Sequence, residues 1–129
     1  MNKVFFDLEW NTGFLDGNSF DEIIEIGAVK TDEEYRQIDG FRRLIRPVIY
    51  RKMNPYIQKI LAITMKDLQG EEPLAAVAKV FFDWCGDCDT LIAWSGNDFG
   101  VLEKNLAHIG MKIPEQLVRY DLQMAYAYR

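Results

Sequence analysis

The sequence predicts a layered α/β domain whose central sheet is part antiparallel and part parallel. The prediction rests on three strand-like segments close together near the N-terminus and on helical segments that then alternate with two further strands. At 129 residues, of which 49% are hydrophobic, the chain is long enough to bury an ordinary core. We therefore expect residues 1–129 to form a single domain with a mixed five-stranded sheet and flanking helices.

The first three strands are predicted from apolar runs with short polar segments between them. They cover residues 3–10, 22–30 and 38–46, and the third stops before Pro47. Because the segments between them are short, an antiparallel meander is favoured over parallel pairing.

The pattern becomes helical after Pro55, where apolar residues recur every three or four positions. The remaining expected elements are helices at 56–62 and 73–84, a strand at 90–94, a helix capped by Asn97 or Asp98 that runs to His108, a fifth strand ending near Asp121, and a final helix at 122–129.

Charge is segregated along the chain, whose formal net charge is −5. Residues 36–59 form a basic strip, with seven Lys and Arg side chains against Asp39 alone. Two interpretations remain open: a solvated face, or the wall of a groove that follows a phosphate backbone. No run is apolar enough for a membrane helix or a signal peptide, and the two cysteines are typical of a reducing compartment, so a cytoplasmic location is expected.

Asp7 and Glu9 are the first candidate functional residues. They stand two apart on the first predicted strand, so both side chains project from one face, about 6 to 7 Å apart along the backbone. The apolar run before them indicates a buried strand, where two charges are costly unless something compensates them. A divalent cation such as Mg²⁺ or Mn²⁺ suits these hard oxygen ligands; the alternative is that both carboxylates are simply solvated.

Three segments in series resemble a known enzyme family. VFFDLEWN at residues 4–11 is followed by IIEIGAVK at 23–30 and then, after a helical region, by LIAWSGNDFGVLEKNL at 91–106. The series resembles the DnaQ-like 3′-5′ exonucleases, or DEDD superfamily, and especially its small RNA-processing and sporulation-inhibitor-like members. The resemblance runs from residue 3 to the end of the chain and implies a ribonuclease-H-like fold.

The resemblance also assigns catalytic roles. It implies that Asp7, Glu9 and Asp98 are catalytic and bind two Mg²⁺ or Mn²⁺ ions in the complete site, an arrangement used for in-line phosphoryl displacement. Asp7 would bridge both ions, Glu9 would hold the ion that bears the attacking water, and Asp98 would hold the other. The implied reaction is hydrolysis at the 3′ end of single-stranded DNA or RNA.

Substrate contacts are implied in the same way. The backbone around Trp10, Asn11 and Thr12 would meet the terminal sugar, and Trp10 is a candidate for stacking on a base. Residues 60–64 would lie beneath the terminal base. The resemblance does not separate DNA from RNA as the substrate.

The family's third motif, a His or Tyr base followed by a fourth Asp, is not found in the sequence. We therefore expect the domain to be incomplete at its C-terminus, with the last helix missing. A lost general base typically costs roughly 10²- to 10⁴-fold in rate, so this chain alone is expected to be inactive or weakly active. The sheet surface left uncovered would favour self-association. Structural roles are expected for Glu25, His108 and Asp121.

Two other functions are carried as alternatives. A non-catalytic module that binds nucleic acid or protein on the same fold is one of them. The other is a thiol-disulfide oxidoreductase, because Cys85 and Cys88 form a C-x-x-C pair. Its context is unfavourable, since the pair follows a helix and has acidic neighbours, both of which raise a thiol pKa.

Overall fold

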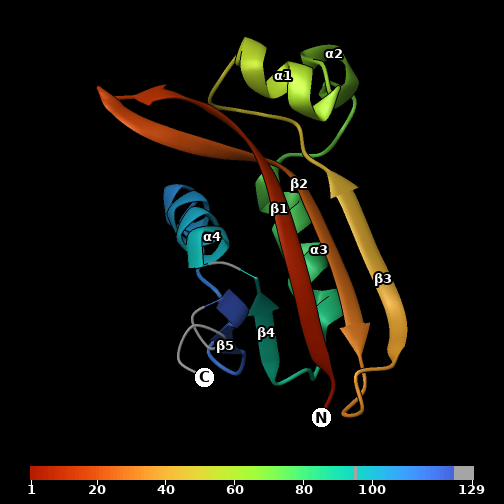
Figure 1. The fold of residues 1–129 in the computed structure, drawn as a ribbon. Coiled ribbons are helices and arrows are strands. Elements are labelled where there is room, and N and C mark those ends of the chain that lie inside the picture. The colour runs from red at the N-terminus through yellow and green to blue at the C-terminus, as the bar shows by residue number, and fades with distance from the viewer. Residues whose placement is uncertain (95, 124–129) are drawn as a thin grey trace.

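A computed structural model of the chain describes residues 1–94 and 96–123 and contains one five-stranded sheet with the order β3-β2-β1-β4-β5 (Figure 1). The strands are β1 (Lys3–Leu15), β2 (Asn18–Thr31), β3 (Gln37–Leu44), β4 (Thr90–Ala93) and β5 (Val118–Asp121). The helices are α1 (Pro55–Leu61), α2 (Met65–Leu68), α3 (Leu74–Cys85) and α4 (Gly96–His108).

The sheet confirms the predicted topology. β1 pairs antiparallel with β2, and β2 with β3, so the first three strands form a meander. β1 pairs parallel with β4, and β4 with β5. The predicted final helix at 122–129 falls mostly on residues 124–129, which lie outside the described part of the chain.

The hairpin of β1 and β2 is longer than predicted. The sequence prediction ended the first strand at residue 10 and began the second at 22, whereas the pairing continues to Leu15 and Asn18. Asp16 and Gly17 both adopt positive φ, 52° and 82°, which allows a two-residue turn whose twist matches the strands. The Asp-Gly pair was the available signal for this turn.

The helices follow the prediction with smaller differences. Asn54 caps α1 by accepting hydrogen bonds from the backbone N–H groups of Tyr56 and Ile57, and the short helix α2 was not predicted. α4 begins at Gly96, so Asn97 and Asp98 lie in its first turn and not at its cap. No helix of the described residues is long and apolar enough to cross a membrane.

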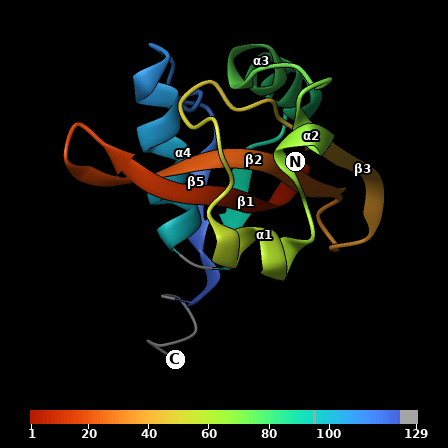
Figure 2. The same ribbon diagram turned by 90° about the horizontal axis from the view of Figure 1, so that it is seen from above.

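Two cores lie on the sheet. α3 and α4 cover one side of it and α1 lies toward the other (Figure 2). The main core joins Val4, Phe6 and Leu8 of β1 to apolar residues of α3 and α4. A smaller core surrounds Ile24, Met53 and Leu68. Burial of these side chains stabilises each by about 1.5 to 3 kcal/mol relative to exposure.

An irregularity in the pairing of β1 and β2 separates these cores. The register shifts between Glu9 and Trp10, which face Glu25 and Ile23, so that Ile24 is an extra residue of β2. As a result, Ile23 and Ile26 both enter the main core while Ile24 enters the smaller one. Such bulges re-aim side chains at strand positions next to functional sites.

A buried carboxylate fixes the loop that leaves β3. Glu22 is only 4% exposed and accepts hydrogen bonds from the backbone N–H groups of Val48, Ile49 and Tyr50 at 2.9, 2.8 and 3.0 Å. Three donors compensate the carboxylate for its lost hydration.

We predict that Glu22→Gln lowers the free energy of unfolding by about 2 to 3 kcal/mol, because the amide has a single acceptor oxygen for three donors. Urea unfolding at neutral pH measures the loss. The control is Glu115→Gln, at an exposed position, which should stay within about 0.5 kcal/mol of the parent. Equal stability of the two variants would contradict the proposed role of the three hydrogen bonds.

Candidate active site

Asp7 and Glu9 project from the face of β1 opposite the main core, as predicted, because they alternate with the buried Phe6 and Leu8. The residue opposite Asp7 on β2 is Gly27, so no side chain competes for the space beside that carboxylate. Glu25 lies opposite Glu9. Like charges at facing positions of a sheet repel, and Arg42 of β3 offsets this by binding Glu25 through its Nε at 2.5 Å.

Asp98 reaches the same region from the first turn of α4. The helix is attached to β2 by Asn105, which is 3% exposed. The Asn105 side chain accepts a hydrogen bond from Ile23 N at 3.1 Å and donates to the carbonyl of Asp21 at 2.7 Å. This polar contact between helix and strand fixes the position of Asp98 beside β1. Sequence reasoning missed Asn105, although a single amide on an apolar helix face was the available signal.

The three carboxylates interact. Burial, the charge of Asp7, a hydrogen bond with Asp7 and the charge of Glu9 together raise the pKa of Asp98 to about 6 from 3.8. Burial, Asp7 and Glu25 raise the pKa of Glu9 as well. A hydrogen bond between Asp7 and Asp98 forms only while one of the two carboxyls is protonated, because two ionised carboxylates have no donor between them. Residues far apart in the chain therefore form one acidic cluster.

The side chains of the cluster are not grouped closely enough to hold one metal ion. Within residues 1–94 and 96–123, no three His, Cys, Asp or Glu side chains are grouped so that they could hold one metal ion. The donor chemistry does suit a hard divalent cation, since all three side chains supply carboxylate oxygens. The charges of Asp7 and Glu9 help to raise the pKa of Asp98, so a positive charge beside these carboxylates would be favourable.

The predicted substrate-binding side chains are partly engaged within the protein. Asn11 is fully buried, donates to the carbonyl of Lys52 at 3.1 Å and accepts from Asn54 N at 2.8 Å. The hydroxyl of Thr12 donates to Asp21 at 2.9 Å. The side chains of Asn11 and Thr12 thus have partners within the protein, and the contact of the backbone at residues 10–12 with a terminal sugar stays a prediction. The Trp10 side chain packs partly buried against the main core.

Residues 60–64 span the end of α1 and the cap of α2. Leu61 and Ile63 pack on the smaller core, while Ile60 is 59% exposed. Ile60 is thus the apolar residue of this segment that a ligand can contact.

The basic strip divides in two. Arg36 pairs with Asp32 and Glu34, and Arg42 with Glu25, so these cations are neutralised locally. Arg51 and Lys52 are exposed on the loop that Asn11 attaches to β1, and Asn11 is two residues from Glu9 of the acidic cluster. Arg43, Arg46 and Lys59 are exposed as well, so most of the strip is accessible to an anionic ligand.

The three residues assigned structural roles have local partners. Glu25 binds Arg42, and His108 packs its ring against Phe20 with centroids 5.8 Å apart. The Asp121 side chain lies so close to Gly96 that a Cβ there would be 2.7 Å from its Oδ2. Glycine at 96 therefore permits the contact between β5 and the start of α4.

The C-x-x-C pair is not arranged for redox chemistry. Cys85 and Cys88 are free thiols, each 1% exposed. Burial, aided by Cys88, raises the pKa of Cys85 to about 12, and burial also raises the pKa of Cys88. A redox thiol instead needs a lowered pKa and access to solvent.

Comparisons with known proteins agree with the resemblance found in the sequence. A family model described as an exonuclease, RNase_T, matches residues 4–127. A DNA polymerase III of the PolC type from Clostridium perfringens (strain 13 / Type A) is 34% identical over 109 residues, which are 83% of this chain and 7% of the polymerase.

Solved structures share the fold. The nuclease domain of 3′hExo, a DEDDh family member bound to rAMP, matches with a TM-score of 0.75 at 20% identity, over 88% of this chain and 62% of that one. E. coli exonuclease I, in complex with a 5cy-dA13 oligonucleotide, gives 0.74 at 17% identity, over 98% of this chain and 29% of that one. The expected ribonuclease-H-like fold is thereby confirmed, and this chain spans less than two thirds of each of these proteins.

The raised pKa of Asp98 predicts a pH-dependent cost to stability. Ionisation of Asp98 is harder in the folded state than in the unfolded state, so the cost is absent below about pH 4, grows toward pH 6 and is complete above it. In EDTA at pH 7.5, the free energy of unfolding of Asp98→Asn should therefore exceed that of the parent by about 1 to 2 kcal/mol. This value allows for screening by water. At pH 3.5 the two should be equal. Denaturant titrations at both pH values measure this, and a constant difference would contradict it.

Because both thiols are buried, we predict that they react slowly with disulfide reagents. In the native protein at pH 8, roughly one Cys85 in ten thousand is a thiolate for a pKa of about 12, so a chromogenic disulfide reagent should release almost no product. After denaturation both thiols should react at once. Rapid reaction of the folded chain, or exchange with a small dithiol, would restore the oxidoreductase interpretation.

Proposed function

Because this chain belongs to the exonuclease family whose model matches residues 4–127, we propose that it hydrolyses phosphodiester bonds at the 3′ end of single-stranded nucleic acid. The observation that carries the proposal is the acidic cluster in which Asp98 of α4 interacts with Asp7 and Glu9 of β1. The substrate class is supported by solved structures of similar fold, in which exonuclease I holds a dT13 oligonucleotide and a 3′-exonuclease recognises the 3′ end of a histone mRNA stem-loop.

The cluster would hold the two divalent cations that the family resemblance implies. Asp7 interacts with both Glu9 and Asp98, so these three carboxylates are the residues that would hold the ions. Bound Mg²⁺ or Mn²⁺ would supply charge neutralisation for the transition state and an activated water.

The protein's own residues position the substrate. The backbone of residues 10–12 lies next to Glu9 and is held rigid by the buried Asn11, so its groups are oriented before a ligand arrives. Ile60 offers an apolar contact for the terminal base, and Arg51 and Lys52 offer charge for the backbone. The proton on Asp98 leaves above about pH 6, so the cluster gains its full negative charge near neutral pH.

We expect slow turnover from this chain by itself. Its sequence lacks the third motif of the family, so no His or Tyr base is matched to the attacking water. The loss corresponds to roughly 10² to 10⁴ in rate.

The catalytic proposal predicts that Asp7→Asn and Asp98→Asn each lower cleavage by at least roughly 100-fold, because each removes a carboxylate from the cluster. The assay follows a 5′-labelled single-stranded oligonucleotide in Mn²⁺ and in Mg²⁺, on denaturing gels that resolve single-nucleotide steps. A 3′-blocked oligonucleotide and EDTA should both stop the reaction.

Glu115→Gln removes one exposed carboxylate outside the cluster and is the matched control. Cleavage that survives Asp7→Asn, or that starts inside a blocked oligonucleotide, would reject the proposal. Binding without any cleavage in either metal would favour the alternative of a non-catalytic module on this fold.

A further inference from the structure

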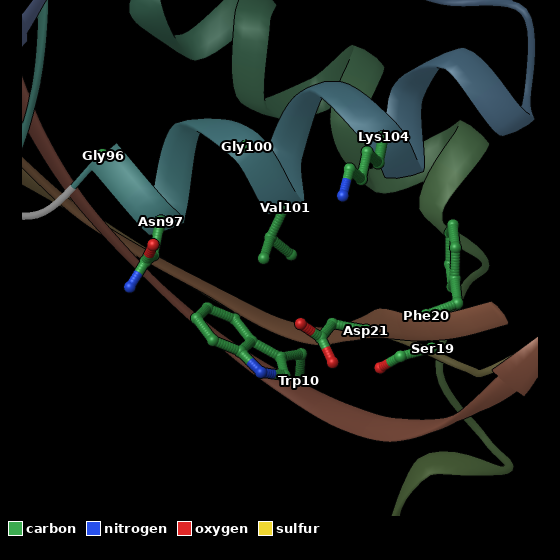
Figure 3. A pocket seen from close by; sticks show the side chains of 9 residues that line it. All are labelled: Trp10, Ser19, Phe20, Asp21, Gly96, Asn97, Gly100, Val101 and Lys104. Carbon is green, nitrogen blue, oxygen red and sulfur yellow. The ribbon is translucent and has the colours of Figure 1, made fainter.

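A pocket of about 390 Å³ lies between α4 and the hairpin of β1 and β2 (Figure 3). Trp10 forms one wall, and Val101 and Lys104 extend from α4 toward the strands. Phe20 of β2 lies at the far end, Asp21 lies beside Trp10, and Asn97 lies at the end nearest the start of α4. We call this the Trp10–Lys104 pocket. Its volume is within the range of roughly 300 to 1,000 Å³ typical of small-ligand sites.

The pocket adjoins the acidic cluster without being part of it. Trp10 follows Glu9 in the chain and Asn97 precedes Asp98, so the pocket is lined by chain neighbours of the cluster, although Trp10 packs on the main-core side of β1 and Asp7 and Glu9 project from the other face. It opens on the α4 side of β1, whereas Ile60 and α1 lie toward the opposite side of the sheet (Figure 2). With the last nucleotide against Ile60, as the proposed function has it, this pocket is the neighbouring concave site that the next nucleotide can enter.

The chemistry of the walls suits one nucleotide. The half-buried indole of Trp10 is an aromatic platform whose face needs no particular base. Lys104 is exposed, and no ion pair or hydrogen bond engages its ammonium group among the described residues. Asp21 is held in place by the hydroxyl of Thr12 at 2.9 Å, which leaves its other oxygen to accept from a base or sugar. Stacking surface and cation together are the usual combination for single-stranded nucleic acid.

The charge balance around the pocket supports a role for Lys104. The neighbouring cluster of Asp7, Glu9 and Asp98 repels a phosphodiester backbone, and Lys104 is the basic residue among those that line the pocket. A cation at this position offsets the repulsion for the phosphate that enters next to the cluster.

We propose that the Trp10–Lys104 pocket binds the penultimate nucleotide of the substrate, on the 5′ side of the bond to be cleaved. Its base stacks on Trp10, and Lys104 contacts the adjoining backbone phosphate. The inference rests on the proposed function, because it assumes that a 3′ end enters at the acidic cluster.

The test is a binding cycle in EDTA, followed by fluorescence anisotropy with 5′-labelled oligo-dT of eight nucleotides. One oligonucleotide is intact, one is abasic at the penultimate position and one is abasic at the fifth position from the 3′ end. For the parent protein, the penultimate abasic residue should weaken binding roughly 5- to 100-fold, the usual worth of one stacked base. Trp10→Leu should bind the intact and the penultimate-abasic oligonucleotides with equal affinity. The oligonucleotide that is abasic at the fifth position should lose the same affinity for the parent and for Trp10→Leu.

Lys104→Ala gives a second, independent measurement at an exposed position that should not disturb folding. The slope of log affinity against log salt should fall by about 0.7, the value for one phosphate contact of a single strand. The matched control is Lys79→Ala, an exposed helical lysine on α3, which should leave the slope unchanged.

The outcomes separate the subsite from the catalytic proposal. The subsite is rejected if the penultimate abasic residue weakens binding equally in the parent and in Trp10→Leu. It is also rejected if Lys104→Ala and Lys79→Ala show the same slope of log affinity against log salt. Both results would count against the subsite even where cleavage depends on Asp7. If the binding cycle behaves as expected but no cleavage depends on Asp7 or Asp98, the subsite stands as a binding site and the catalytic proposal fails. Absence of any oligonucleotide binding overturns both.

Discussion

The close approach of Asp7, Glu9 and Asp98 is the constraint on which the candidate site depends. Three carboxylates repel one another, and an isolated chain would let them separate. Here β1 fixes two of them, and Asn105 attaches α4 to β2 so that Asp98 cannot move away. Burial and the charges of Asp7 and Glu9 raise the pKa of Asp98 to about 6, so a proton relieves the repulsion only below about that pH. The core, which supplies the rigidity, therefore bears the electrostatic cost of the cluster.

Buried polar groups fix the positions of the loops, as the apolar core fixes the positions of the helices. Glu22 holds the loop after β3 through three backbone N–H groups, and Asn11 holds its continuation. Both sit on the hairpin strands that also carry the acidic residues. The basic loop bearing Arg51 and Lys52 is thus attached to the same strands as the carboxylates, which keeps the two charge types apart but adjacent. A substrate with an anionic backbone and a cation-dependent reaction requires this separation.

Much of this arrangement could be predicted from the sequence, because it follows from periodicity. The element order, the shared face of Asp7 and Glu9, and the placement of Asp98 at the start of a helix all depend on local patterns. The bulge at Ile24 could not be predicted, since strict alternation places Ile24 and Ile26 on one face. Nor could the partners of Glu22 and Asn105, because hydrogen bonds between distant segments leave no local pattern. The pocket beside Trp10 depends on those same contacts, and sequence reasoning did not find it.

Burial acts on both candidate motifs of the chain and has opposite consequences for them. For Cys85 it raises the pKa to about 12, so the nucleophilic thiolate is almost absent at neutral pH. For Asp98 it contributes to a pKa of about 6, which still leaves the carboxylate ionised under the same conditions. A bound cation would lower the pKa of Asp98, whereas Lys30, which lowers the pKa of Cys85, does not offset the burial of that thiol. Residue spacing made both motifs candidates, and the protonation state that each environment permits at neutral pH decides between them.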